Sequence, residues 1–272
     1  MNTDPRDFLR LGCVMRKARR YAPGTPVWVN LDTAAGTTAA SKFYGGLFGW
    51  RVLAWHRPLD DASHWWVFAH DGRDVGSLAP GPHPVWEMYM SVDNADETAR
   101  VVVDNGGAVA LWLGEIDEIS RLAVCTDPFG ARFGLWEPKR RPAASRMHEP
   151  NSFTWGELSC REIDAAKGFY RAVFGWDGRT RVVAESSTYT EFFLPDVDQP
   201  VAGMVQMNQL WPEDVPPHWM LYFAVADTDE IVSRVGQLGG AVSVAPFDRT
   251  DVGRIAVIND PEGAFFSVLQ RR

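Results

Sequence analysis

The sequence predicts a mixed α+β protein built from two tandem copies of one domain. Three short segments occur twice and in the same order: FYGGLFGW at 43–50 and FYRAVFGW at 169–176, DPFGARF at 127–133 and DPEGAFF at 260–266, and GGAV at 106–109 and 239–242. The offsets between the copies are 126, 133 and 133 residues, so the spacing is nearly constant. Ordered self-similarity of this kind is the sequence signature of a repeated structural unit.

Each copy is expected to contain two modules, and each module holds a strand, a helix and three further strands. In the first module, alternating apolar residues predict a strand at 26–33, and apolar residues at helical spacing predict a helix at 37–48. That helix is expected to end at Gly49, because glycine is a common C-cap residue. The remaining elements of the first copy are strands at 51–57, 63–70, 75–78 and 86–92, a helix at 95–105, and strands at 108–112, 121–126 and 132–136.

The second copy repeats this order. Its elements are a strand at 153–159, a helix at 165–174, strands up to about residue 207, a strand at 219–226, a helix at 228–238 and strands up to 269. The predicted boundaries are a basic extension at 1–23, a first domain at 24–138, a charged linker between prolines at 139–149 and a second domain at 150–272.

Composition excludes several classes of function. The net charge of −8 argues against a nucleic-acid partner. No run of about 18 apolar residues predicts a membrane span. The three cysteines, an odd number without a CxxC pair, indicate reduced thiols in a cytoplasmic protein. We therefore expect a monomer or homodimer whose partner is a small molecule.

The module order, with the FY–FGW phrase on the first helix and DPxG before the last strand, resembles the vicinal oxygen chelate superfamily. This superfamily comprises glyoxalase, bleomycin-resistance and dioxygenase proteins, and the closest resemblance is to its tandem two-domain actinobacterial members. The resemblance implies that each pair of modules forms a cup-shaped curved sheet with the site inside the cup. In the metal-dependent members, ligands come from the first, fifth and last strands of the cup.

The ligand positions that the resemblance implies lack metal-binding side chains in this chain. They fall on Trp28, Glu87 and Gly134 in the first domain and on Trp155, Met220 and Ser267 in the second. One carboxylate among six positions does not make a divalent-metal site, so we expect neither a metal nor another cofactor. Only a histidine displaced by one residue, His83 or His218, would restore a metal ligand.

Strand periodicity selects the residues that share the inner face of each cup with those positions. They are Trp28, Asn30, Asp32, Glu87, Tyr89, Ser91, Arg132, Gly134 and Trp136 in the first domain, and Trp155, Glu157, Ser159, Met220, Tyr222, Ala224, Phe265, Ser267 and Leu269 in the second. The candidate ligand-binding residues are Trp28, Asn30, Tyr89, Arg132, Trp136, Trp155, Met220, Tyr222, Phe265 and Ser267. Core packing is the alternative role for the large aromatic and apolar members.

Glu87 and Glu157 are the candidate catalytic residues. A buried carboxylate without a partner is costly, so each glutamate is exposed, paired with an arginine such as Arg132, or functional.

Three functions follow from these residues. The first is a metal-independent protein that binds a planar aromatic or polyketide-like molecule in antibiotic resistance or natural-product metabolism, where the acidic chain suits a cationic ligand. The alternative is a metal-independent isomerase, cyclase or lyase, in which a glutamate acts as general base and Tyr89 or Tyr222 donates a hydrogen bond. The second alternative is a metal-dependent activity of the glyoxalase or dioxygenase type.

Overall fold

The computed structural model describes residues 21–54, 65–116, 120–140, 143–184, 187–209 and 211–272, and it confirms the predicted α+β architecture. Each half of the chain contains the strand–helix–three-strand module twice. The first half consists of β1 (Pro26–Thr33), α1 (Thr37–Phe48), β2 (Arg51–Ala54), β3 (Trp66–His70), β4 (Arg73–Pro80), β5 (Val85–Ser91), α2 (Ala95–Asp104), β6 (Ala108–Ile116), β7 (Ser120–Thr126) and β8 (Arg132–Pro138).

The second half repeats the order of the first. It consists of β9 (Ser152–Cys160), α3 (Ile163–Phe174), β10 (Asp177–Ala184), β11 (Ser187–Phe193), β12 (Pro200–Gln206), β13 (His218–Ala224), α4 (Thr228–Val235), a 3₁₀ turn (Gly236–Leu238), β14 (Ala241–Arg249), β15 (Gly253–Asn259) and β16 (Phe265–Arg271). None of the helices in the described ranges is long and apolar enough to cross a membrane.

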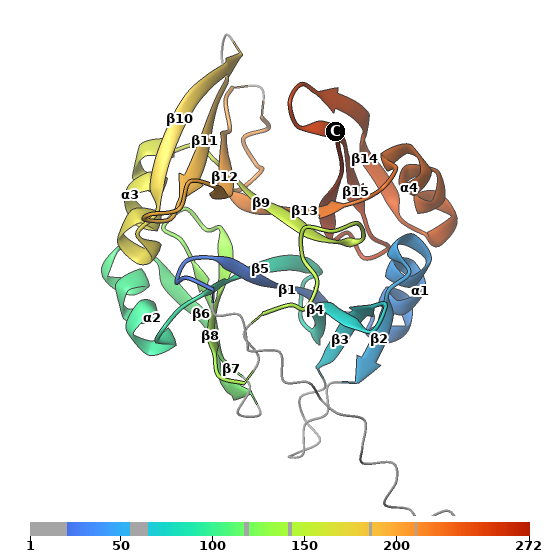
Figure 1. The fold of residues 1–272 in the computed structure, drawn as a ribbon, viewed down its shortest axis with the longest axis horizontal. Coiled ribbons are helices and arrows are strands. Elements are labelled where there is room, and N and C mark those ends of the chain that lie inside the picture. Colours follow the sequence, from blue (N-terminus) through green and yellow to red (C-terminus); the bar gives the residue numbers. More distant parts are fainter. Residues whose placement is uncertain (1–20, 55–64, 117–119, 141–142, 185–186, 210) are drawn as a thin grey trace, which may run out of the picture.

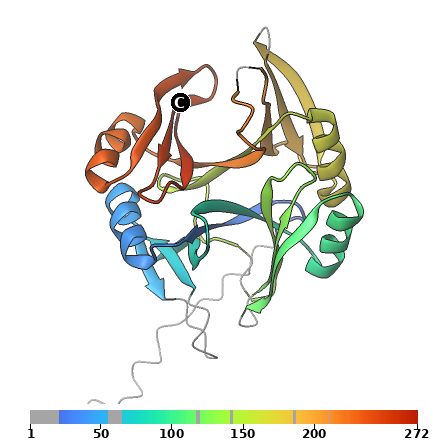
Figure 2. The same ribbon diagram turned by 180° about the vertical axis from the view of Figure 1, so that it is seen from behind.

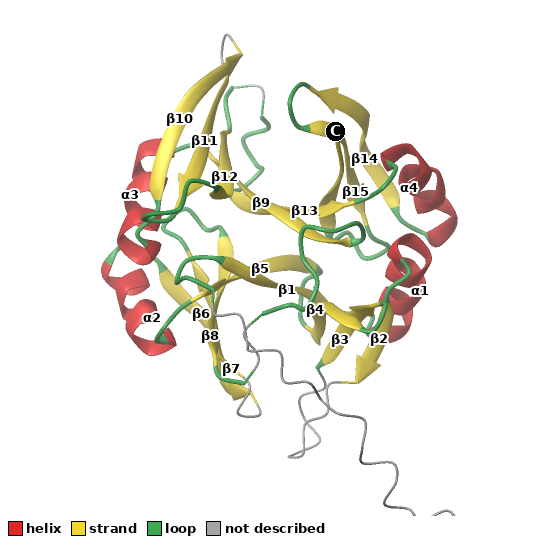
Figure 3. Ribbon diagram, in the orientation of Figure 1, coloured by secondary structure: helices red, strands yellow, loops and turns green. Residues whose placement is uncertain are grey.

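Each half forms one eight-stranded sheet. The strand orders are β2-β3-β4-β1-β5-β8-β7-β6 and β10-β11-β12-β9-β13-β16-β15-β14, so the two modules of a half join through β1 and β5 or through β9 and β13. The sheets curve away from each other and stand back to back, as Figures 1 and 2 show from opposite sides. The helices cover the two flanks, where α1 contacts α4 and α2 contacts α3 (Figure 3).

The main core lies between the two sheets and belongs to both halves. The helix aromatics of the repeated phrase are buried, and they reach across the boundary between the halves. Phe48 of α1 lies 5.6 Å from Phe223 of β13, and Phe174 of α3 lies 5.8 Å from Phe133 of β8, measured between ring centroids. Each helix therefore completes the core of the other half.

Two buried hydrogen bonds connect the repeated motifs across this boundary. The Tyr44 hydroxyl, in the first aromatic phrase, donates to Asp260 Oδ2 of the second DPxG turn over 2.9 Å. The Tyr170 hydroxyl, in the second phrase, donates to Asp127 Oδ2 of the first turn over 3.0 Å. Each tyrosine oxygen also accepts an indole N–H from its own half, from Trp86 or Trp219 over 3.0 Å.

The element boundaries differ from the predicted ones by a few residues. The helix predicted at 228–238 is α-helical only to Val235 and ends as a 3₁₀ turn. Gly49 ends α1 in the left-handed conformation, as expected, with φ of 71°. The predicted strand at 51–57 and the extension at 1–23 lie partly outside the described residues, so the structure covers them only in part.

The crossed hydrogen bonds should contribute to stability as specific pairs. Replacing Tyr44 by Phe leaves the buried Asp260 carboxylate short of a donor, so we expect Y44F to lower the free energy of unfolding by about 1–3 kcal/mol. Urea denaturation of Y44F, D260N and the double variant should show a coupling energy within this pair. The same cycle with D127N, whose partner is Tyr170, serves as control and should be additive. Additivity in both cycles would contradict the assignment.

Candidate functional site

The structure brings the predicted inner-face residues together on the concave side of each sheet. We call these concave faces the first cup and the second cup. In the first cup, Trp28 pairs with Tyr89 across β1 and β5, and Tyr89 pairs with Gly134 on β8. In the second cup, the equivalent partners are Trp155, Tyr222 and Ser267. The two cups open in opposite directions (Figure 1), so each is a separate candidate site.

The aromatic residues of the first cup form a packed cluster of their own. Trp28 stacks on Trp136 with ring centroids 4.9 Å apart, and Tyr89 meets Trp136 edge to face. All three side chains are at most 1% exposed. The Trp28 indole N–H donates to Ser77 Oγ, and Ser77 donates in turn to Asn30 Oδ1. The polar atoms of this cup thus bond mainly to one another.

The segment between the domains covers the first cup. Ala143 and Ala144 are buried against its aromatic cluster, and Met147 packs beside them. The Ala144 N–H donates to the Val27 carbonyl of β1, and the Ser145 N–H donates to the Asp74 carbonyl of β4. Residues 143–147 therefore cover the aromatic part of the first cup, while Arg132 stays partly exposed.

Glu87 of the first cup has a structural partner. Arg132 Nε and Nη2 both lie 2.6 Å from Glu87 Oε1, and the carboxylate is 1% exposed. Burial raises the pKa of Glu87, while the Arg132 guanidinium acts in the opposite direction. Nearby Asp32 accepts a hydrogen bond from Asn30, and burial together with the Glu87 charge raises its pKa to about 7.

The second cup is more open. Trp155, Glu157, Met220 and Tyr222 are all half-buried, and Phe265 is 37% exposed. Trp28, Asn30, Glu87 and Tyr89, the equivalents of the first four, are 1% exposed, whereas Arg132, the equivalent of Phe265, is partly exposed. The second cup therefore presents Trp155, Glu157, Met220, Tyr222 and Phe265 partly to solvent, whereas Ser267 is buried.

Glu157 lies at the centre of a polar network in the second cup. Tyr222 OH donates to Glu157 Oε1 over 2.9 Å, and the Trp155 indole N–H donates to the Tyr189 hydroxyl over 3.0 Å. Burial raises the pKa of Glu157, and the Tyr222 and Tyr189 hydroxyls act against that rise. The pKa of Tyr222 is also raised well above its ordinary value by burial and by the Glu157 charge, so the phenol remains a proton donor.

Two glycines explain why the tyrosines lie differently in the two cups. A Cβ at Gly134 would come 2.1 Å from the Tyr89 ring, so the missing side chain lets this ring lie flat on β8. Ser267 takes the equivalent place in the second cup. A Cβ at Gly203 would come 2.1 Å from the Tyr189 hydroxyl, so glycine admits this hydroxyl beside Glu157.

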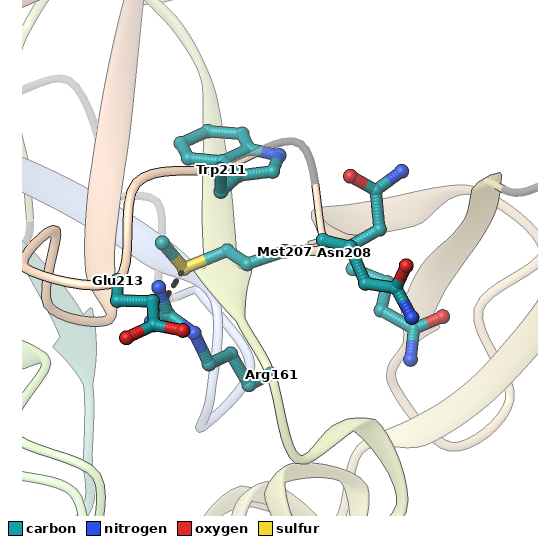
Figure 4. Close-up of a pocket in the computed structure, with 7 residues that line it drawn as sticks. Arg161, Met207, Asn208, Trp211 and Glu213 are labelled. Atoms are coloured by element: carbon teal, nitrogen blue, oxygen red, sulfur yellow. Dashed lines mark hydrogen bonds between the residues drawn. The ribbon is translucent and has the colours of Figure 1, made fainter.

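A pocket of about 680 Å³ lies where the inner face of β9 ends. Its lining residues are Arg161, Gln206, Met207, Asn208, Gln209, Trp211 and Glu213 (Figure 4). Arg161 donates to the carbonyls of Pro212 and Val215, both over 2.9 Å, and thereby fixes the loop that follows β12. The Trp211 ring lies 6.3 Å from His218, which lies 5.2 Å from Phe265 of the second cup. The pocket thus adjoins the second cup.

The residues present do not fit a metal site of the family type. In the first cup, the Tyr89 ring fills the place that a ligand at Gly134 would take. The second cup offers Trp155, Met220 and Ser267, and these are poor donors for a divalent ion. His218 Nδ1 lies 2.9 Å from the Pro216 carbonyl, outside any such cluster. Within the described ranges, no three His, Cys, Asp or Glu side chains gather to hold a metal.

Comparison with known proteins identifies the family. Residues 152–268 match the model of the Glyoxalase/Bleomycin resistance protein/Dioxygenase superfamily. The chain is 36% identical over 264 residues to "Putative glyoxylase CFP32" of Mycobacterium tuberculosis. The aligned region covers 94% of this chain and 98% of the relative. The chain belongs to this superfamily. It is also 33% identical over 275 residues to "Anthracycline biosynthesis protein DauV" of Streptomyces sp., covering 93% and 95% of the two chains.

Solved structures of the superfamily share the fold at low sequence identity. BphC, a halotolerant catechol dioxygenase, superposes with a TM-score of 0.61 at 15% identity, covering 92% of this chain and 87% of that one. The Mn(II)-bound glyoxalase from Novosphingobium aromaticivorans gives 0.60 at 14%, covering 92% and 82%. These similarities establish the tandem fold.

Sequence reasoning did not include several residues that now lie at the second cup. Tyr189 of β11 and Arg249 of β14 were not among the predicted site residues. The register of β14 shifts twice along its length, so simple alternation does not show which of its residues face inward. Glu157 and Tyr222 were both predicted as site residues, and the Tyr222 hydroxyl donates a hydrogen bond to Glu157.

The raised pKa of Asp32 predicts a pH-dependent stability. The folded chain holds this proton more tightly than the unfolded chain, whose Asp pKa is about 3.9, so the Asp32 contribution falls as pH rises from about 4 to about 7. D32N should match the parent at pH 4 and be more stable at pH 8 by at least about 1 kcal/mol. Urea denaturation at both pH values measures this, and an equal effect of D32N at both would contradict it.

Proposed function

We propose that the second cup binds a planar aromatic or polyketide-like small molecule, without a metal, in natural-product metabolism or antibiotic resistance. The strongest support comes from the side chains that surround Glu157. Trp155, Tyr189 and Tyr222 lie around its carboxylate on a face that stays partly exposed. Flat rings stack on such side chains, and a few polar groups among them fix the orientation of the ligand.

The relatives support the same area of metabolism. DauV is named for anthracycline biosynthesis, and the similarity runs along nearly the whole of both chains. The donor set of the second cup supports a metal-independent role, because the family's ligand positions hold Trp155, Met220 and Ser267. The first cup, with its linker cover, is assigned a structural role in this proposal.

Acid/base catalysis at Glu157 is the second candidate function. A carboxylate whose pKa is raised by burial is a better base near neutral pH than an exposed one. In such a reaction Glu157 would take a proton from a carbon next to a carbonyl. The Tyr222 hydroxyl, 2.9 Å from Glu157 Oε1, would then hydrogen-bond to the oxygen on which negative charge develops.

Binding should depend on the tryptophan of the second cup. Using alizarin, a planar dihydroxyanthraquinone, as probe, we expect W155A to weaken binding about tenfold, since ring stacking contributes roughly 0.5–1.5 kcal/mol beyond area burial. Quenching of intrinsic tryptophan fluorescence measures the affinity. W28A is the matched control: it should lower stability by about 3–5 kcal/mol while leaving the affinity of the folded protein unchanged.

The following outcomes would contradict this prediction. Equal affinity of W155A and the parent would exclude the second cup, and a loss of affinity in folded W28A alone would place the ligand in the first cup. Loss of binding on addition of EDTA would contradict the proposal that binding needs no metal.

Catalysis is tested by the conservative variants of both glutamates. For any hydroxyanthraquinone or polyketide-type compound that the parent converts, as followed by mass spectrometry, E157Q should lower turnover about 100-fold or more with little change in affinity. E87Q should leave turnover within about threefold, because Glu87 pairs with Arg132. Parent turnover should rise with pH through the pKa of Glu157. Conversion that persists in E157Q would remove Glu157 from the chemistry.

A further inference from the structure

Two arginines from opposite ends of the second sheet meet at one tyrosine. Arg181 lies on β10 and Arg249 on β14, and these strands are the two edges of the sheet. The Arg181 Cζ lies 5.7 Å from the centroid of the Tyr189 ring, and the Arg249 Cζ lies 5.5 Å from it. Arg249 therefore extends across the concave side, because Tyr189 is on β11, beside β10.

Arg249 therefore lies on the concave side of the second cup, close to the residues around Glu157. The Tyr189 hydroxyl accepts the Trp155 indole N–H, and Glu157 lies beside it on β9. The Arg249 charge acts to lower the pKa of the Glu157 carboxyl, which agrees with a position of Arg249 near Glu157. In the described part of the chain, no carboxylate lies within ion-pairing distance of Arg249.

Two arginines, Arg181 and Arg249, lie at the second cup, although the chain as a whole is acidic. Arg181 has only a long contact of 4.0 Å to Glu191, with both side chains partly exposed. Asp248, next to Arg249 in sequence, pairs instead with Arg254 at 3.2 Å. The net charge of −8 therefore does not describe this part of the second cup.

The contact with Tyr189 also sets how Arg249 can bond. A cation–π contact uses the charge of the guanidinium and not its N–H groups, so these groups can still donate hydrogen bonds. They match a carboxylate, which a guanidinium binds through two parallel hydrogen bonds. A neutral or cationic group would gain much less from the same position.

We propose that the ligand of the second cup is a planar aromatic acid, whose carboxylate or similarly acidic oxygen binds Arg249 while its rings lie against Trp155. This proposal rests on the proposed function and narrows it to a ligand class. It also replaces the cationic ligand that the acidic composition suggested. Arg249 is then a specificity-determining residue, and Tyr189 positions it.

Three anthracenes with one ring system and different charges test the proposal: 9-anthracenecarboxylate, 9-anthracenemethanol and 9-(aminomethyl)anthracene. Isothermal titration of the full chain should give an affinity for the carboxylate about tenfold above that for the alcohol, with the amine weakest, as expected for a charged hydrogen bond. R249Q should remove this tenfold preference and leave the affinity for the alcohol unchanged. R249K should restore part of the preference, since it keeps the charge without the paired geometry.

R100Q is the matched control, because Arg100 is an exposed residue of α2 in the first domain and its loss changes the net charge equally. It should alter none of the three affinities. Equal binding of the carboxylate and the alcohol by the parent would overturn the inference while leaving the proposed function intact. So would an equal loss of all three affinities in R249Q, since that indicates a structural role. Failure of all three compounds to bind the parent would contradict the proposed function itself.

Discussion

The crossed pairing of tyrosine and aspartate is the constraint on which the rest of the structure depends. Each repeated helix carries a tyrosine that reaches the DPxG turn of the other half, so the two copies share one core rather than having one each. The aspartates satisfy this arrangement at both oxygens, because Oδ1 accepts two backbone N–H groups of its own turn while Oδ2 accepts the phenol. Buried carboxylates are costly unless fully bonded, so the turn, the helix tyrosine and the tryptophan beside it stabilise one another.

The concave faces, which lie on the other side of the sheets from this constraint, differ between the two halves. The carboxylate of the first cup is on β5, as Glu87, and that of the second is on β9, as Glu157. Yet Glu87 pairs with Asn30 of β1 and Glu157 with Met220 of β13, so the two acids occupy opposite members of the same cross-strand pair. One acid is held by an arginine and the other by tyrosines, and this difference separates a structural ion pair from a polar network that faces solvent.

Much of the fold follows from the sequence, and less of the site does. The repeated phrases, the helix ends at glycine and the alternating strands are local signals, so they predicted the modules and the inner faces of β1, β5, β9 and β13. The linker cover of the first cup depends on how a segment without periodicity packs, as Ala143 and Ala144 do, and no local signal encodes that. Arg249 was missed for a related reason: two register shifts in β14 change which residues face inward. Tertiary contacts between distant strands decide both features.

The linker over the first cup has a consequence for competition. A segment attached at both ends to the domains that it covers has an effective concentration on the order of millimolar, whatever the amount of protein present. It also brings backbone hydrogen bonds to β1 and β4 that a free molecule would have to replace. A small molecule that binds the aromatic cluster of the first cup would have to displace this segment. Under the proposed function, the described part of the chain therefore offers the second cup alone for a ligand, although the fold is duplicated.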